Sequence, residues 1–185
     1  AKKLDEAVNT ELKNLGMPHA ELSVALTETA GDAPSQQGLE TVEFLVSTNP
    51  RQPAHSLMKV ASGGELSRIS LAIQVITAQT SETPSLVFDE IDVGIGAGIA
   101  KVVGEMLRQL GETTQIICVT HQAQVAGQGH HHFCVSKTTQ SDTTVTSVMA
   151  LEGGHKVKEI ARMLAGKDLS DESLAHAHQL VANLN

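Results

Sequence analysis

The chain has 185 residues, of which 41% are hydrophobic, and a formal net charge of −8 at pH 7. This much apolar sequence is sufficient for a well-packed domain and argues against disorder. The acidic balance and the absence of Trp and Tyr argue against direct nucleic-acid binding, which relies on clustered cations and stacked aromatic rings.

Cysteine usage and hydropathy indicate the compartment. Cys118 and Cys134 are isolated from one another, each within an apolar run, so neither a disulfide framework nor a cysteine-based zinc site is expected. No apolar stretch is long enough to span a membrane, and the first residues lack the apolar core of a signal peptide. We expect a cytoplasmic protein with no membrane partner.

The first half of the chain begins with a predicted helix followed by a hairpin. Leu4, Val8, Leu12 and Leu15 recur at helical spacing, and Gly16 supplies a stop signal. Residues 21–28 and 41–48 alternate apolar and polar side chains, which predicts antiparallel strands. The segment between them, 29–38, is rich in turn residues and is predicted to be a mobile surface loop.

The middle of the chain carries a β-α-β pattern. The short apolar runs 86–88 and 116–119 are typical of parallel strands buried on both faces. Residues 97–111 between them have helical apolar spacing. Since parallel strands end at the same edge of a sheet, where ligands bind, Asp89, Glu90 and His121 are expected to converge there. Beyond this unit, residues 133–151 predict a second hairpin, and Lys156–Leu164 and Ser173–Leu184 predict two closing helices.

Two adjacent glycines stand at the start of a further predicted helix, in "VASGGEL" (60–66). Ser62 and Glu65 have the spacing of a capping box, which is a purely structural explanation. It does not explain Gly63 and Gly64, which are poor helix formers. Glycines there let a ligand approach the helix N-terminus, whose amides suit a phosphate. Both interpretations stay open at this point.

The carboxylates after the first parallel strand also have two interpretations. Acids often follow strands as helix caps, and an isolated histidine is most often structural. In the functional interpretation, Asp89 binds a hydrated magnesium ion, since Mg²⁺ prefers oxygen ligands, and Glu90 is the base that orients and activates the attacking water. His121, at the end of the neighbouring strand, would then hydrogen-bond a terminal phosphate or the attacking water.

The order of these motifs resembles the ATP-binding heads of the ABC superfamily, with a signature motif, a Walker B strand and a switch histidine. The stretches "KVASGGELSRISLAIQVI", "FDEIDVGIGAG", "VTHQAQVAGQGHHHFCVSK" and "EIARMLAG" are similar to the RecN family of the chromosome-maintenance branch, over nearly the whole chain. The resemblance implies an α/β fold, the C-terminal lobe of an ABC-type ATPase head. That lobe has a parallel β-α-β core, antiparallel hairpins and flanking helices.

The resemblance also implies domains, cofactors and partners. Residues 1–16 would end a coiled-coil helix and 17–185 would form the lobe, with ATP and Mg²⁺ as cofactors. It assigns Glu90 and His121 to catalysis, Asp89 to the metal, and Ser62, Gly63, Gly64, Glu65 and Asp92 to the nucleotide. Its partners would be a second head, paired through bound ATP in a homodimer, and DNA, held by the full assembly. The implied role is recombinational repair of double-strand breaks.

The chain departs from the family pattern at three places. Gly96, Ala97 and Gly98 stand where the loop after the Walker B motif carries a Ser, and "THQAQ" lacks a Leu-Pro between His and Gln. No Walker A motif is present, and the only Gly-Lys pair, Gly166-Lys167, lacks the upstream Gly. The family places that loop in an N-terminal lobe, so the chain corresponds to half a head that is predicted to be inactive alone.

The sequence offers three other interpretations. "GHHHF" (129–133) suggests a metal site, but alternation on a strand leaves only two imidazoles on one face, which favours a solvated strand end. A non-enzymatic interaction module, derived from such a head, would not depend on Glu90. A dinucleotide-binding site is poorly supported, because the spacing is G-x-G-x-G and not G-x-G-x-x-G.

Overall fold

The computed structural model describes residues 1–28, 38–49, 51–60, 62–80, 83–89, 91–140, 143–166 and 168–182. Its contacts divide the chain into two compact units. The first comprises Ala1–Thr83 with Val93–Ile95, and the second Pro84–Asp92 with Gly96–Asn185. Each unit has its own secondary structure and is described separately.

The first unit opens with α1, Lys2–Asn14, as predicted. Val8, Leu12 and Leu15 are fully buried, so the apolar stripe of this helix faces the core. Gly16 follows with a φ of 73°, the left-handed conformation that glycine adopts without a Cβ clash at helix ends. The predicted boundary between domains at residue 16 stays a prediction.

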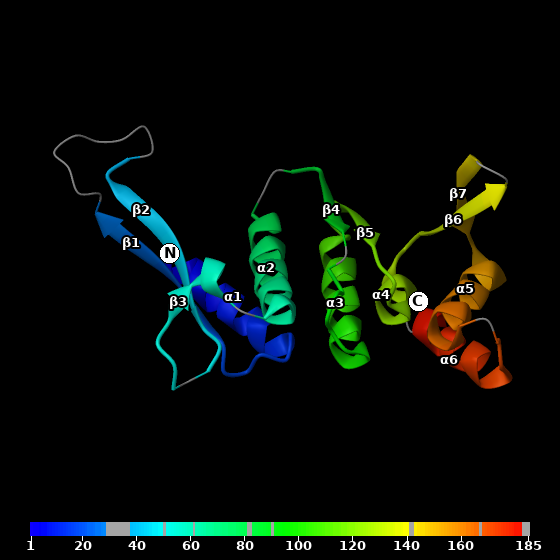
Figure 1. Cartoon of the computed structure of the whole chain (residues 1–185), viewed down its shortest axis with the longest axis horizontal. Helices are drawn as coiled ribbons and strands as arrows, with labels where there is room; N and C mark the ends of the chain where they lie inside the picture. Colours follow the sequence, from blue (N-terminus) through cyan, green and yellow to red (C-terminus); the bar gives the residue numbers. More distant parts are fainter. Residues whose placement is uncertain are drawn as a thin grey trace. The chain divides into compact units, whose positions relative to one another are not determined.

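A three-stranded antiparallel sheet follows α1 (Figure 1). Strand β1, Glu21–Glu28, pairs with β2, Glu40–Ser47, which confirms the predicted hairpin. The short β3, His55–Ser56, adds to β2 and leads into η1, Leu57–Lys59; neither was predicted. Most of the predicted mobile loop, 29–37, lies outside the described residues.

Side chains of α1 satisfy the backbone of β1. The Asn9 amide donates to the Leu22 carbonyl at 2.9 Å and accepts from the Leu22 N–H at 2.7 Å, as a neighbouring strand would. The Val24 N–H donates to the Asp5 carboxylate at 3.1 Å. Because β1 is an edge strand, these bonds protect its open edge and fix α1 to the sheet.

Helix α2, Gly63–Ala78, completes the first unit and confirms the helix predicted after the two glycines. Ile69 and Ala72 have no exposed surface and belong to its predicted apolar stripe. Helix α2 packs against α1, so the core of this unit lies between the two helices and the sheet.

The second unit contains the predicted β-α-β arrangement. Strand β4, Ser85–Asp89, and strand β5, Gln115–Val119, are parallel, with Asp89 opposite Val119. They are connected by α3, Ala97–Leu110, which buries Val103 and Leu107. The carboxyl ends of the two strands therefore lie side by side, as expected.

The prediction that both strands are buried on both faces was wrong for the described chain. Phe88 is 3% exposed, whereas Val87 is 67% exposed on the opposite face of β4. On β5, Ile117 and Val119 are 49% and 53% exposed. Only one face of the β4–β5 pair is covered by the described residues, although both faces have the apolar composition of buried strands.

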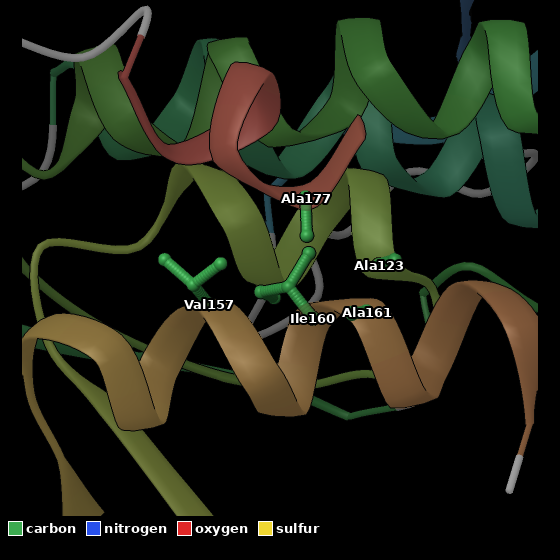
Figure 2. Close-up of a cluster of buried hydrophobic side chains, with 5 residues drawn as sticks. All are labelled: Ala123, Val157, Ile160, Ala161 and Ala177. Carbon is green, nitrogen blue, oxygen red and sulfur yellow. The ribbon is translucent and has the colours of Figure 1, made fainter. Parts of the chain in front are cut away.

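Helices and a hairpin complete the second unit. Helix α4, Ala123–Gln128, was not predicted. Hairpin β6–β7, His132–Gln140 and Thr143–Leu151, and helices α5, Gly153–Ala165, and α6, Asp171–Ala182, confirm the predicted elements. Figure 2 shows α4, α5 and α6 meeting in a cluster of buried side chains: Ala123, Val157, Ile160, Ala161 and Ala177. No described helix is long and apolar enough to cross a membrane.

Helix α4 packs closely against α3. A Cβ at Gly104 on α3 would lie 2.7 Å from Gln128 Cγ and 3.0 Å from the Gln124 carbonyl. Only glycine permits this approach. Arg108 also donates to the Gln128 carbonyl at 2.8 Å, so a cation stands at the C-terminal end of α4, where carbonyls lack helical partners.

Candidate functional site

The residues predicted from sequence lie in both units. Ser62, Gly63, Gly64 and Glu65 form the start of α2 in the first unit. Asp89 ends the first parallel strand of the second unit, and Asp92 and His121 lie in the segments after the two strands. Glu90 lies outside the described residues.

Ser62 is the N-cap residue of α2, with extended backbone angles, but its hydroxyl makes no cap hydrogen bond. The capping-box interpretation was therefore wrong for Ser62. Its side chain is exposed, while Glu65 in the first helical turn is half-buried. An exposed hydroxyl beside the free amides of a helix N-terminus can donate to or accept from a ligand.

The two glycines have different surroundings. A Cβ at Gly64 would lie 3.2 Å from the Gly94 carbonyl, and Gly94 itself has a φ of +74°. The close approach of the Gly94 backbone therefore accounts for glycine at position 64. A Cβ at Gly63 would meet nothing within 4 Å, so no described neighbour accounts for glycine there. That open side is where a ligand could approach the backbone.

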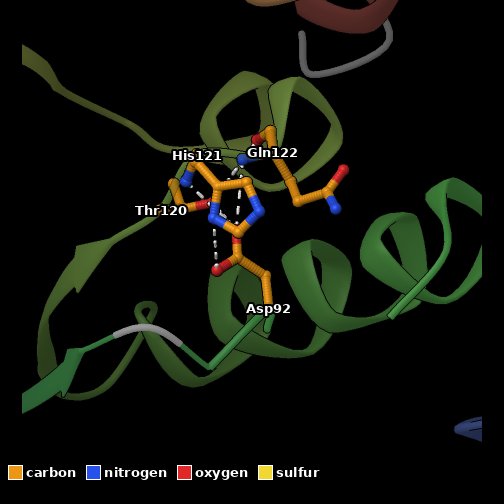
Figure 3. Close-up of polar contacts among 4 residues, drawn as sticks. All are labelled: Asp92, Thr120, His121 and Gln122. Carbon is orange, nitrogen blue, oxygen red and sulfur yellow. Dashed lines mark hydrogen bonds and ion pairs between the residues drawn. The ribbon is translucent and has the colours of Figure 1, made fainter. Parts of the chain in front are cut away.

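A buried carboxylate organises the second group. Asp92 has no exposed surface, and its Oδ2 accepts hydrogen bonds from the Thr120 hydroxyl, the His121 N–H at 3.2 Å and the Gln122 N–H at 3.1 Å (Figure 3). The turn after β4 is thereby joined to the segment after β5 and to the start of α4. Asp92 thus satisfies backbone amides at the N-terminus of α4.

His121 is held by the same carboxylate and still reaches solvent. Its Nδ1 lies 3.3 Å from Asp92 Oδ1, and its side chain is 65% exposed. A carboxylate beside Nδ1 favours a proton on that nitrogen, which leaves Nε2 as an acceptor in the neutral ring and a donor in the charged ring. His121 is therefore oriented to present Nε2 to a ligand.

The carboxylates of Asp89 and Asp92 affect the pKa of Cys118, which lies near the end of β5. Burial, together with the negative charges of Asp92 and Asp89, raises the pKa of the Cys118 thiol to about 12. Asp89, the last residue of β4, is exposed. An exposed carboxylate at the carboxyl edge of parallel strands can serve as a ligand to a hard cation.

Sequence reasoning missed two features of this site. It did not single out Thr120, and it placed Asp92 against the nucleotide, whereas the Asp92 carboxylate is buried among protein donors. One signal was available: Thr120 stands two residues before Gln122, the N-cap of α4, and its hydroxyl accepts from the Gln122 N–H at 3.0 Å. A Thr hydroxyl that binds a backbone N–H two residues further on is a common local motif in turns and at helix starts.

Two other predicted features also have definite positions. Gly166, of the only Gly-Lys pair, ends α5 with a φ of 79°, so it is a helix cap. His130 and His131 are exposed before β6, as a solvated strand end requires, but His132 is half-buried. Burial and the charge of Lys156 lower the pKa of His132. The described residues contain no group of three potential metal ligands of the His, Cys, Asp or Glu type.

The fold is similar to SMC ATPase head domains. A head domain from Pyrococcus yayanosii superimposes with a TM-score of 0.65 at 16% identity, over 86% of this chain and 28% of that one. A second structure, from work on ATP-driven dimerisation and DNA-stimulated activation of SMC ATPases, gives 0.57 at 15% identity, over 90% of this chain and 96% of that one. The class of fold is thus the one seen in SMC head domains.

Sequence comparison identifies the relatives within that class. DNA repair protein RecN of Vibrio cholerae is 48% identical over 98% of this chain, which covers 32% of that protein. RecN of Xylella fastidiosa is 44% identical over 100% of this chain and 33% of its own length. No family model matches. The chain is similar in sequence to DNA repair protein RecN and spans about a third of the length of these relatives.

Proposed function

We propose that the chain is the C-terminal lobe of an SMC-like ATPase head, preceded by the end of a coiled-coil helix. In the full-length protein it would act in recombinational repair of DNA double-strand breaks. One observation carries the proposal: Asp89 ends β4, His121 comes shortly after the adjacent parallel strand β5, and the buried Asp92 holds the segment that contains His121. The names of the sequence relatives support the repair role.

The residues at the strand ends suit a nucleotide with magnesium. Asp89 offers an exposed carboxylate, and one carboxylate is sufficient because Mg²⁺ keeps several waters and takes its other ligands from phosphates. Bound there, the ion would neutralise phosphate charge. Glu90 would accept a proton from the attacking water, and His121 would present Nε2 to the terminal phosphate or to that water. Asp92 would keep His121 oriented.

The start of α2 would serve the nucleotide of a second head. Ser62 and Gly63 present an exposed hydroxyl and an open backbone, with no cap bond to occupy them. Bound ATP would then bridge two copies in a homodimer, with helix amides facing the terminal phosphate. One SMC neighbour comes from work on ATP-driven dimerisation and DNA-stimulated activation. DNA would be held by the full assembly, because the net charge of −8 does not favour binding by this chain.

The test is Glu90→Gln in the full-length protein. Turnover should fall by roughly 10²–10⁴, the range for loss of a general base, while ATP binding is retained. Glu105→Gln is the matched control, since Glu105 lies on α3 and, among the described residues, forms an exposed pair with Lys101. Normal turnover by Glu90→Gln would contradict the assignment. The 185-residue chain alone should not turn over ATP, because it lacks a Walker A loop.

A second candidate is a non-enzymatic interaction module. The exposed apolar residues Val87, Ile117 and Val119 favour a protein partner over this face of the β4–β5 pair. In the proposed ATPase that partner would be the N-terminal lobe. An interaction module would bind its partner equally well with Glu90→Gln and would show no loss of turnover, so the same variant distinguishes the two functions.

A further inference from the structure

Arg68 joins two helices of the first unit. It lies on α2, one turn after Gly64, and is half-buried. Its Nε donates to the Gly64 carbonyl at 3.0 Å, and its Nη1 donates to the Leu15 carbonyl at 3.3 Å. One planar guanidinium therefore connects the first turn of α2 to the end of α1.

The carbonyl at the α1 end of this connection is a suitable partner for a cation. Leu15 is the C-cap residue of α1, and the last carbonyls of a helix lack helical partners and carry partial negative charge. The side chain of Leu15 is fully buried, as is that of Ile69 beside Arg68 on α2. Helix α1 packs against α2, and Arg68 adds a polar connection at the end of α1.

The carbonyl at the α2 end belongs to the turn that presents the candidate ligand groups. Gly64 follows the exposed Ser62 and the open Gly63, and its other side faces the backbone of Gly94. Holding the Gly64 peptide therefore sets the direction of the neighbouring amides. A guanidinium can hold two carbonyls with a fixed geometry, whereas a lysine ammonium is a single flexible point charge.

We infer that Arg68 is a positioning residue that transmits displacement of α1 to the Ser62–Gly64 segment. The inference rests on the proposed function, in which α1 ends a coiled-coil helix and this segment contacts the nucleotide of a second head. Asn9 and Asp5 bind α1 to β1, so α1 and the sheet move together. Arg68 supplies the polar connection from that body to the first turn of α2.

The experiment measures hydrogen exchange in the nucleotide-free full-length protein. Lys13→Gly loosens the last turn of α1 at an exposed position, and with Arg68 present we expect exchange in peptides covering 62–70 to rise about fivefold, the change in opening expected for a helix glycine. In the Arg68→Gln background, adding Lys13→Gly should change exchange there no further. Arg68→Lys should give an intermediate response. Arg51→Gln, which removes an exposed arginine, should leave the response intact.

Two results would overturn the inference. One is an equal response to Lys13→Gly with and without Arg68, and the other is no response in the protein that carries Arg68. Neither measurement requires nucleotide, so both results are separate from failure of the proposed function. That failure would appear as normal ATP-dependent pairing by Ser62→Arg.

With ATP present, Arg68→Gln should weaken head pairing while ATP binding by a single head is unchanged, and Arg68→Lys should restore part of the pairing. If Arg68 were purely structural, Arg68→Gln would lower thermal stability without weakening head pairing selectively over ATP binding.

Discussion

His121 Nδ1 lies 3.3 Å from Oδ1 of Asp92, a carboxylate with no exposed surface, while the His121 ring itself is largely exposed. The Asp92 carboxylate is thus fixed inside the protein, while the His121 ring beside it is accessible from solvent. Because Asp92 also binds the backbone N–H groups of His121 and Gln122, it determines where the loop after β5 lies relative to the end of β4. This relationship is the structural basis of the proposed catalytic edge.

Asp92→Asn tests this relationship. The amide removes the charge and points an NH₂ at donors, so the isolated chain should lose about 1–3 kcal/mol of unfolding free energy in urea titrations. His121→Ala should change stability by less than about 0.5 kcal/mol, because the ring is mainly exposed, yet both variants should slow turnover of the full-length protein. Asp168→Asn, at an exposed position, is the control. Unchanged stability of Asp92→Asn would contradict the network.

Cys118 provides a pH-dependent test of the acids around it. A pKa near 12 means that the native thiol should react with iodoacetamide about two to three orders of magnitude more slowly than a free cysteine at pH 8. The folded pKa is raised above the ordinary 9.0, so this group favours the folded state below pH 9 and the contribution is lost as pH rises towards 12. Asp89→Asn should speed the native reaction. A native Cys118 that reacts as a free thiol would refute the assigned environment.

Local sequence patterns predicted most elements because each rests on near neighbours. The period of Val8, Leu12 and Leu15 identified α1, and the alternation in β1 and β2 identified the hairpin. The parallel pairing of β4 and β5 was also predictable, since two short apolar runs with a helix between them have few possible connections. Helix α4 was missed because it is one of the shortest elements and is stabilised by contacts from Gly104, Arg108 and Asp92, which are distant in sequence.

The residues of the candidate site could be predicted from the sequence, but the contacts of each side chain could not. Asp89 and His121 were placed at one edge from topology alone, and the pairing of Asp89 with Val119 confirms that the strands end together. That Asp92 is buried and Ser62 is not a capping side chain could not be read from sequence. Both depend on whether tertiary neighbours occupy the polar atoms, which spacing along the chain does not specify.

The uncovered face of the β4–β5 pair gives a further prediction. Val87→Asp should change the stability of the isolated chain by no more than about 0.5 kcal/mol, since Val87 is 67% exposed. In the full-length protein the same change should lower the thermal midpoint and turnover, because the charge would be buried against the N-terminal lobe. Phe88→Ala, on the covered face, should cost about 3–5 kcal/mol in the isolated chain. Equal tolerance of Val87→Asp in both contexts would mean that no lobe covers this face.

The central claim is that this chain contributes a signature motif to the nucleotide of a partner head. Turnover by mixtures of two full-length variants measures it directly. Ser62→Arg places a bulky cation at the exposed N-cap of α2, and it should abolish ATP-dependent pairing while a single head still binds ATP. Mixed with a Walker-A-defective protein, it leaves one complete composite site in each heterodimer. We predict that the mixture recovers part of the turnover that neither variant shows alone; no recovery, with heterodimers shown to form, would contradict the account.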